Sequence, residues 1–146
     1  MSMLKEVTQD STALGGLPIY VFTMLFFLLT DYRSNSYRLF IALVLCYSIT
    51  ILIRAIHFKW RPDRQDHSNW IEKIDASSFP SLHSMRAVVL FGTLAYFFSN
   101  PLAWIFSILG MILVGGTRIL LSRHYLTDVL GGAGIGLVVL ILVLSV

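Results

Sequence analysis

Long apolar segments alternate with short polar ones along the whole chain. A helix needs about 20 mostly apolar residues to cross a membrane. Five segments come close to that length: Leu14 to Thr30, Tyr37 to Phe58, Pro80 to Phe98, Pro101 to Leu121 and Tyr125 to Val146. The pattern predicts an all-α fold, a polytopic membrane bundle of about five transmembrane helices. Because the connecting segments are short, residues 1–146 are expected to form a single membrane domain.

The composition favours a membrane protein. Hydrophobic residues make up 56% of the 146 residues and charged residues only 13%, whereas soluble domains carry about 25% charged residues. Cys46 is the only cysteine, so no disulfide forms within the chain. The basic residues that raise the pI to about 9.2 lie between the apolar segments and form no single patch. No nucleic-acid partner is therefore expected.

Polar residues gather near the ends of four of the apolar segments. In a five-helix bundle, the second and fourth segments end on the same membrane face on which the third and fifth begin. The residues at these places are Arg54 and Arg61, then Ser81, Leu82 and His83, then Arg118, His124 and Asp128. Ionisable residues are costly inside a membrane and usually mark a functional site. The sequence therefore predicts one site on this face.

The basic residues of this site indicate that it binds an anion. Three arginines share the face: Arg54, Arg61 and Arg118. Guanidinium groups match phosphate oxygens with two parallel hydrogen bonds, so three of them suit a multiply charged anion. Pro80 fits the first turn of a helix, which leaves backbone N–H groups near Ser81 and Leu82 to hold anionic oxygens.

The histidines add a reactive group to the anion site. His124 and Asp128 are four residues apart, and this spacing predicts neighbours on one helical face. A carboxylate that accepts from one imidazole nitrogen leaves the other nitrogen as a nucleophile. His83 comes from a different helix and is a candidate for the second acid or base. Together these residues indicate phosphoryl transfer through a phosphohistidine.

Other polar residues nearby are interpreted as surface or interface residues without a catalytic role. His57 and His67 fit no catalytic pattern and are expected at the surface or the membrane interface. Lys59, Trp60 and Trp70 are typical of residues that anchor a helix at that interface.

Two further arginines keep two interpretations each. Arg86 follows His83 by three residues and either contacts the substrate site or pairs with an acidic group such as Asp75. Arg123 either touches the substrate or extends to the interface as a snorkelling cation.

Three short motifs carry a resemblance to a known family. They read RAIHFKWRP at residues 54–62, PSLH at 80–83 and TRILLSRHYLTD at 117–128. In spacing and order they resemble the signature K-x6-R-P, P-S-G-H and S-R-x5-H-x3-D of the type 2 phosphatidic acid phosphatase (PAP2) superfamily, which includes the vanadium haloperoxidases. This chain departs from the signature at Arg54 (usually lysine), Leu82 (usually glycine) and Thr117 (usually serine).

The resemblance implies a PAP2/haloperoxidase-like core and a role for each matching residue. His124 would attack the phosphorus and Asp128 would orient it. His83 would protonate the leaving oxygen and then activate water. The phosphoryl oxygens would be held by Arg54, Arg61, Ser81, the Leu82 N–H and Arg118. The family needs no metal, and neither a metal nor another cofactor is expected here.

A site framed by apolar helices at the membrane interface implies a lipid substrate. The resemblance predicts a phosphatase that hydrolyses a polyprenyl diphosphate, phosphatidic acid or phosphatidylglycerophosphate. A lipid head-group phosphotransferase stays open, because the P-S-L-H form also occurs in relatives with that activity. A membrane protein that binds anions without catalysis is the third possibility. The sequence leaves the oligomeric state open.

The orientation in the cell membrane depends on which cations are counted. Counting Lys59 and the other cations of the 59–79 connection would place that face inside. If those cations serve a site, Arg33 and Arg38 outweigh Lys5 and place the opposite face inside. In microbial relatives the site usually faces away from the cytoplasm, so a non-cytoplasmic site is expected.

Overall fold

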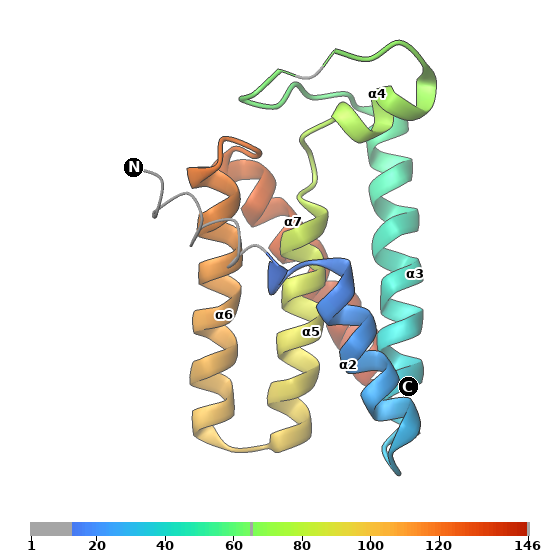
Figure 1. Cartoon of the computed structure of the whole chain (residues 1–146), viewed down its shortest axis with the longest axis vertical. Coiled ribbons are helices and arrows are strands. Elements are labelled where there is room, and N and C mark those ends of the chain that lie inside the picture. Colours follow the sequence, from blue (N-terminus) through green and yellow to red (C-terminus); the bar gives the residue numbers. More distant parts are fainter. Residues whose placement is uncertain (1–12, 65, 146) are drawn as a thin grey trace.

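The computed structural model describes residues 13–64 and 66–145, and these form helices and connections without strands (Figure 1). The helices are α2 (Leu17–Leu29), α3 (Arg33–Ile56), α4 (Trp70–Ala76), α5 (Leu82–Phe98), α6 (Pro101–Leu120) and α7 (Leu126–Leu144). The central helix α5 packs against α3, α6 and α7, while α2 packs against α3. The predicted all-α bundle is confirmed.

The third apolar segment begins later than the sequence suggested. Pro80 precedes α5, and the Phe79–Pro80 peptide bond is cis. Ser81 is the N-cap, because its side chain accepts a hydrogen bond from the backbone N–H of Ser84 at 3.4 Å. The prediction that Pro80 occupies the first helical turn is therefore wrong.

The connection over residues 59–79 contains the short helix α4, which the hydrophobic pattern did not predict. Asn69 caps it by accepting from the backbone N–H of Glu72 at 2.9 Å, and the Asn69 side-chain amide donates back to the Glu72 carboxylate at 2.9 Å. A polar cap followed three residues later by glutamate is a known helix-start pattern. The helix lies at one end of the bundle, beside the end of α3 (Figure 1).

Small residues bring α7 against the beginning of α5. A Cβ atom added at Gly132 would lie 2.5 Å from the Ser81 carbonyl oxygen, and one added at Gly136 would lie 2.9 Å from the Met85 carbonyl oxygen. Such contacts leave no room for a side chain, so glycine permits the close approach. As a consequence the backbone N–H of Ser81 donates to the Asp128 carbonyl at 3.0 Å, which joins the first turns of the two helices.

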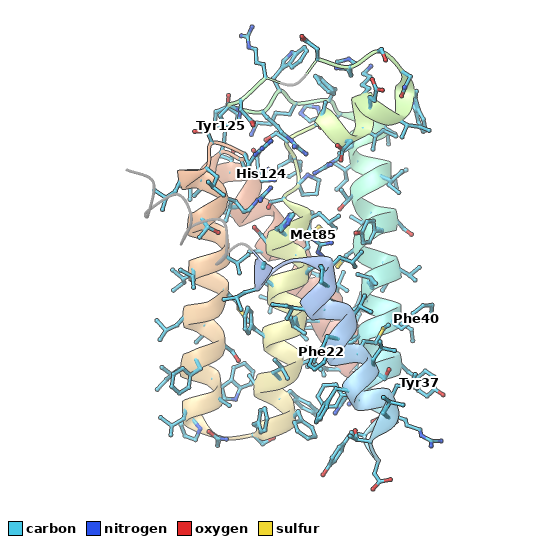
Figure 2. The ribbon with its side chains drawn as sticks, viewed as in Figure 1. Phe22, Tyr37, Phe40, Met85, His124 and Tyr125 are labelled. Carbon is cyan, nitrogen blue, oxygen red and sulfur yellow. The ribbon has the colours of Figure 1, made fainter. Side chains whose placement is uncertain are left out.

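Apolar side chains cover much of the outside of the bundle. Among the described residues, three helices are long and apolar enough to cross a membrane, namely α3, α6 and α7. Helices α2 and α5 are apolar but shorter. Phe22, Tyr37 and Phe40 are exposed on the outer surface, with 71%, 60% and 53% of their area accessible (Figure 2). The number of spans stays a prediction, and Lys5, which entered the orientation argument, lies outside the described residues.

Candidate active site

A cavity of about 200 Å³ lies at the end of the bundle where α4 is found. It is lined by Arg54, Arg61, Asp75, Leu82, His83, Arg118 and His124. Every residue predicted from the sequence for this site belongs to the lining except Ser81 and Asp128, while Asp75 was not predicted. Figure 2 shows His124 at this end of the bundle and Met85 deeper along α5. The structure thus brings together residues from α3, α5, α6 and the connections.

Backbone carbonyl groups hold two of the arginines in place. The two terminal nitrogens of Arg54 donate to the Ile74 carbonyl at 3.2 Å and to the Pro80 carbonyl at 3.0 Å. Arg61 donates to the carbonyl of Asp75 at 2.6 Å. Burial lowers the pKa of the Arg61 guanidinium below its ordinary value. Three guanidinium groups line the cavity beside the single carboxylate of Asp75, so the cluster suits an anionic ligand.

Arg118 lies in the last turn of α6, and its backbone shapes the turn that carries His124. Its carbonyl oxygen accepts from the backbone N–H of Arg123 at 3.0 Å and from that of His124 at 3.2 Å. The end of α6 therefore fixes the position of the histidine relative to the arginine cluster.

His124 precedes α7, which begins after the N-cap residue Tyr125. The prediction that His124 and Asp128 share a helical face is therefore wrong, because the backbone is extended at Tyr125 (φ −78°, ψ 159°). His124 Nδ1 lies 2.8 Å from the Ser78 carbonyl oxygen and 4.0 Å from Asp128 Oδ2. The predicted direct hydrogen bond to the carboxylate is replaced by one to a backbone carbonyl.

The electrostatic surroundings of His124 disfavour its charged form. Burial is the largest cause, followed by the positive charges of Arg118 and Arg61. Together they lower the pKa of His124 to about 3. The imidazole is only 3% exposed. A neutral imidazole with Nδ1 engaged has Nε2 left as its available nitrogen.

Asp128 is fully buried and holds three donors. Its carboxylate accepts from Lys59 Nζ at 2.5 Å, from the Tyr125 backbone N–H at 2.8 Å and from the Ser78 hydroxyl. Lys59 is therefore not simply an interface anchor, as its sequence context suggested. Lys59 occupies a variable position inside the motif at residues 54–62, and Ser78 lies outside the motifs. No spacing pattern relates either residue to Asp128.

Ser81 and Leu82 play different parts at the start of α5. Ser81 is fully buried, and its hydroxyl oxygen accepts from the Ser84 hydroxyl at 2.9 Å, so it is engaged as the helix cap and does not line the cavity. Leu82 lines the cavity, and it is not among the described non-glycine residues with positive φ. Replacing the usual glycine with leucine therefore causes no backbone strain at this position.

The two arginines with open interpretations both have structural partners. Arg86 is buried and donates to the Tyr47 hydroxyl at 3.0 Å, so the predicted partner Asp75 is wrong. Arg123 forms an ion pair with Asp63 at 2.9 Å, outside the cavity lining.

The remaining histidines stay outside the site. His67 packs near the rings of Phe58 and Trp60, and His57 is exposed at the end of α3. Within residues 13–64 and 66–145 there is no group of three or more His, Cys, Asp or Glu residues placed to hold a metal ion. The metal-free reaction stays a prediction.

Comparison with known proteins places this arrangement in a family. The model of the PAP2 superfamily matches residues 38–146. The chain belongs to the PAP2 superfamily. The matched range contains all three motifs and every residue that lines the cavity.

Two kinds of relative support the assignment. Phosphatidylglycerophosphatase B of Bacillus subtilis (strain 168) is 37% identical in an alignment that covers 51% of this chain and 46% of that protein. The chain thus spans about half the length of the curated relative it matches. Among solved structures, a transmembrane PAP2-type phosphatidylglycerolphosphate phosphatase from Bacillus subtilis has a TM-score of 0.81 at 26% identity, covering 99% of this chain and 77% of the other. LpxE of Aquifex aeolicus has the same fold, with a TM-score of 0.82 at 22% identity over 100% of this chain and 88% of the other.

Proposed function

We propose that this protein is a metal-independent lipid phosphate phosphatase that works through a phosphohistidine on His124. The observation that carries the proposal is the position of His124, which lines the arginine cavity while its Nδ1 atom is bonded to the Ser78 carbonyl. This arrangement leaves Nε2 as the nucleophile. The family membership and the phosphatase names of the relatives support the same activity.

The reaction takes place in two displacements. In the first, His124 Nε2 attacks the phosphorus, an N–P bond forms, and the P–O bond to the lipid breaks while His83 protonates the leaving oxygen. In the second, His83 takes a proton from water, the water oxygen attacks phosphorus, and the N–P bond breaks to release phosphate.

The arginines stabilise the charge that these displacements develop. Arg54, Arg61 and Arg118 neutralise the equatorial phosphoryl oxygens, where electrostatic stabilisation contributes most. The Leu82 amide lies at the first position of α5, where backbone N–H groups lack partners within the helix. This amide is the remaining donor for a phosphoryl oxygen.

An apolar groove beside the site supports a lipid substrate. The groove has a volume of about 420 Å³ and is lined by residues of α6 and α7, together with Val88 of α5. Gly115 and Gly116 line it within one helical turn of Arg118, and Leu126 lines it two residues after His124. A hydrocarbon chain laid in this groove would carry its phosphate to the arginine cavity.

The volume of the cavity and the name of the curated relative bear on which lipid is the substrate. A cavity of about 200 Å³ favours a small head group, as in a polyprenyl diphosphate. The name of the curated relative favours phosphatidylglycerophosphate. Phosphatidic acid is the third candidate.

We place the protein in the cell membrane as a multi-pass protein, with the site on the non-cytoplasmic face. Arg33 and Arg38 lie at the start of α3, the opposite end of that helix from Arg54. An excess of arginine at cytoplasmic ends supports this orientation. A cysteine introduced at the exposed residue Lys73 should react with an impermeant thiol reagent from outside intact cells, since the native Cys46 is buried.

The decisive experiment is a phosphate-release screen with the purified full chain in detergent and excess chelator. The panel contains lipid monophosphates and diphosphates, and vanadate serves as the inhibitor because it imitates the pentacoordinate phosphorus. We expect release that vanadate blocks and that His124→Ala abolishes. His57→Ala is the matched control, because His57 is exposed outside the cavity. Release that persists in His124→Ala would refute the mechanism.

The two alternatives are separated in the same assay. With an alcohol acceptor present, a phosphotransferase yields a phosphorylated acceptor, whereas the phosphatase yields free phosphate. A protein that only binds anions would retain lipid phosphate after both histidines are replaced and would show no turnover.

A further inference from the structure

Ser78 contacts the proposed nucleophile His124, and Lys59 contacts Asp128, but neither residue occupies a fixed position of the family signature. We propose that both are positioning residues for His124, and that Asp128 acts on the imidazole through Ser78 instead of through a direct hydrogen bond. The inference deepens the proposed function, on which its kinetic part rests.

The first step concerns which nitrogen of His124 carries the proton. A backbone carbonyl oxygen only accepts hydrogen bonds, so the 2.8 Å contact between Nδ1 and the Ser78 carbonyl requires a proton on Nδ1. The lone pair of the neutral ring then lies on Nε2. The Ser78 carbonyl therefore selects the tautomer that can attack phosphorus.

The second step concerns what fixes the Ser78 carbonyl. The backbone N–H of Ser78 donates to the Lys59 carbonyl oxygen at 2.8 Å, and the Ser78 hydroxyl donates to Asp128. Ser78 is fully buried. The N–H of Ser78 is thus bonded to Lys59 and its hydroxyl to Asp128. These two bonds hold the Ser78 carbonyl in one orientation.

The third step concerns Lys59. Its ammonium group lies 2.5 Å from Asp128 Oδ1 and 2.8 Å from Thr127 Oγ1, and 4.9 Å from the centre of the Tyr125 ring. A buried carboxylate is unfavourable unless a cation and hydrogen bonds compensate its charge. Lys59 provides that cation while its own side chain stays 31% exposed. It therefore keeps Asp128 able to accept from Ser78.

The experiment measures the tautomer and the kinetics of full-length variants in detergent. Ser78→Ala removes the hydroxyl but keeps the carbonyl. Lys59→Met removes the charge, and Lys59→Arg keeps it. The controls are Ser107→Ala, which removes another buried hydroxyl, on α6 and outside the cavity lining, and Lys73→Met, whose exposed ammonium lies 5.8 Å from the Phe58 ring.

Nitrogen-15 NMR of the imidazole rings reports the tautomer without any substrate. We expect a pure Nδ1–H form of His124 in the unaltered protein and in both controls, and a mixture of tautomers in Ser78→Ala and Lys59→Met. We expect kcat to fall about tenfold or more in these two variants, the equivalent of one lost hydrogen bond, with KM changed less than twofold. Lys59→Arg should recover most of kcat.

The outcomes separate this inference from the proposed function. A His124 tautomer that is unchanged in both Ser78→Ala and Lys59→Met would overturn the positioning role, even if the protein is an active phosphatase. If the protein releases no phosphate from any lipid, the proposed function fails, while the tautomer still decides whether Lys59 and Ser78 position His124.

Discussion

The guanidinium of Arg86 donates a 3.0 Å hydrogen bond to the hydroxyl of Tyr47 inside the helical bundle. Arg86 is 5% exposed, and its Nε atom has no hydrogen-bond partner among the described residues. The Tyr47 hydroxyl is therefore a main source of compensation for a buried cation that lies three residues after His83. This contact joins α3 to α5 just below the site.

Removing that hydroxyl should destabilise the fold. Tyr47→Phe keeps the ring, whose centre lies 5.9 Å from the guanidinium carbon, but removes the acceptor. The free energy of unfolding should fall by about 1–3 kcal/mol, the cost of leaving a buried polar group without a partner. Thermal unfolding in detergent measures the change. Tyr37→Phe is the control, because Tyr37 is 60% exposed, and an equal loss in both variants would contradict the role of the contact.

The arginines and histidines of the cavity could be predicted from the sequence, and Lys59, Ser78 and Asp75 could not. The arginines and histidines of the cavity follow from the apolar segments, because each lies where a segment begins or ends. Lys59, Ser78 and Asp75 enter the site only because the 59–79 connection folds back over it, with Ser78 bonded to Lys59 across 19 residues of chain. Such contacts depend on tertiary packing and leave no periodic pattern.

Two local errors have specific physical causes. The spacing of His124 and Asp128 was interpreted with the helical repeat, but Tyr125 is the N-cap and His124 lies before the helix. In contrast, α4 had a usable pattern, since Asn69 and Glu72 form a cap with the helix-start spacing. The hydrophobic pattern obscured it because α4 has only 7 residues.

Arg54 should not be replaceable by the lysine that the family usually has. Its two terminal nitrogens bond two separate carbonyls, those of Ile74 and Pro80. A lysine ammonium lacks this rigid fork, so Arg54→Lys should lower kcat/KM by about tenfold, a loss of about 1.4 kcal/mol in transition-state stabilisation. Phosphate-release kinetics measure the effect. Arg64→Lys, an exposed substitution in the same connection, should have none, and full activity of Arg54→Lys would show that charge alone suffices.

His124 should remain uncharged well below the range in which histidine usually titrates. Its pKa is lowered to about 3, first by burial and then by Arg118 and Arg61, from an ordinary value of about 6.5. In the unfolded chain the ring binds a proton near pH 6.5, so acidification from there towards pH 3 favours unfolding. Arg118→Gln removes a neighbouring positive charge and should raise the pKa of His124. An NMR titration tests both statements, and a pKa near 6.5 in the unaltered protein would contradict them.

The groove between α6 and α7 offers a test of the lipid chain itself. An added Cβ atom at Gly116, which lines the groove, would meet no atom within 4 Å, and the same is true at Gly134 on α7, which does not line it. Gly116→Leu should therefore fill the groove without disturbing the packing. We expect KM for a long-chain lipid phosphate to rise about tenfold, or about 1.4 kcal/mol of lost binding, with little change for a short-chain soluble phosphate.

The matched variant Gly134→Leu places the same side chain on the neighbouring helix, so it controls for added bulk and for the higher helix propensity of leucine over glycine. Its KM values for both substrates should stay within twofold of those of the unaltered protein. Both substrates place their phosphate in the same cavity. A difference in KM between them therefore reports the binding of the hydrocarbon chain. If Gly116→Leu affects long-chain and short-chain substrates equally, the groove does not hold the hydrocarbon chain, and the lipid must approach the arginine cavity from another side.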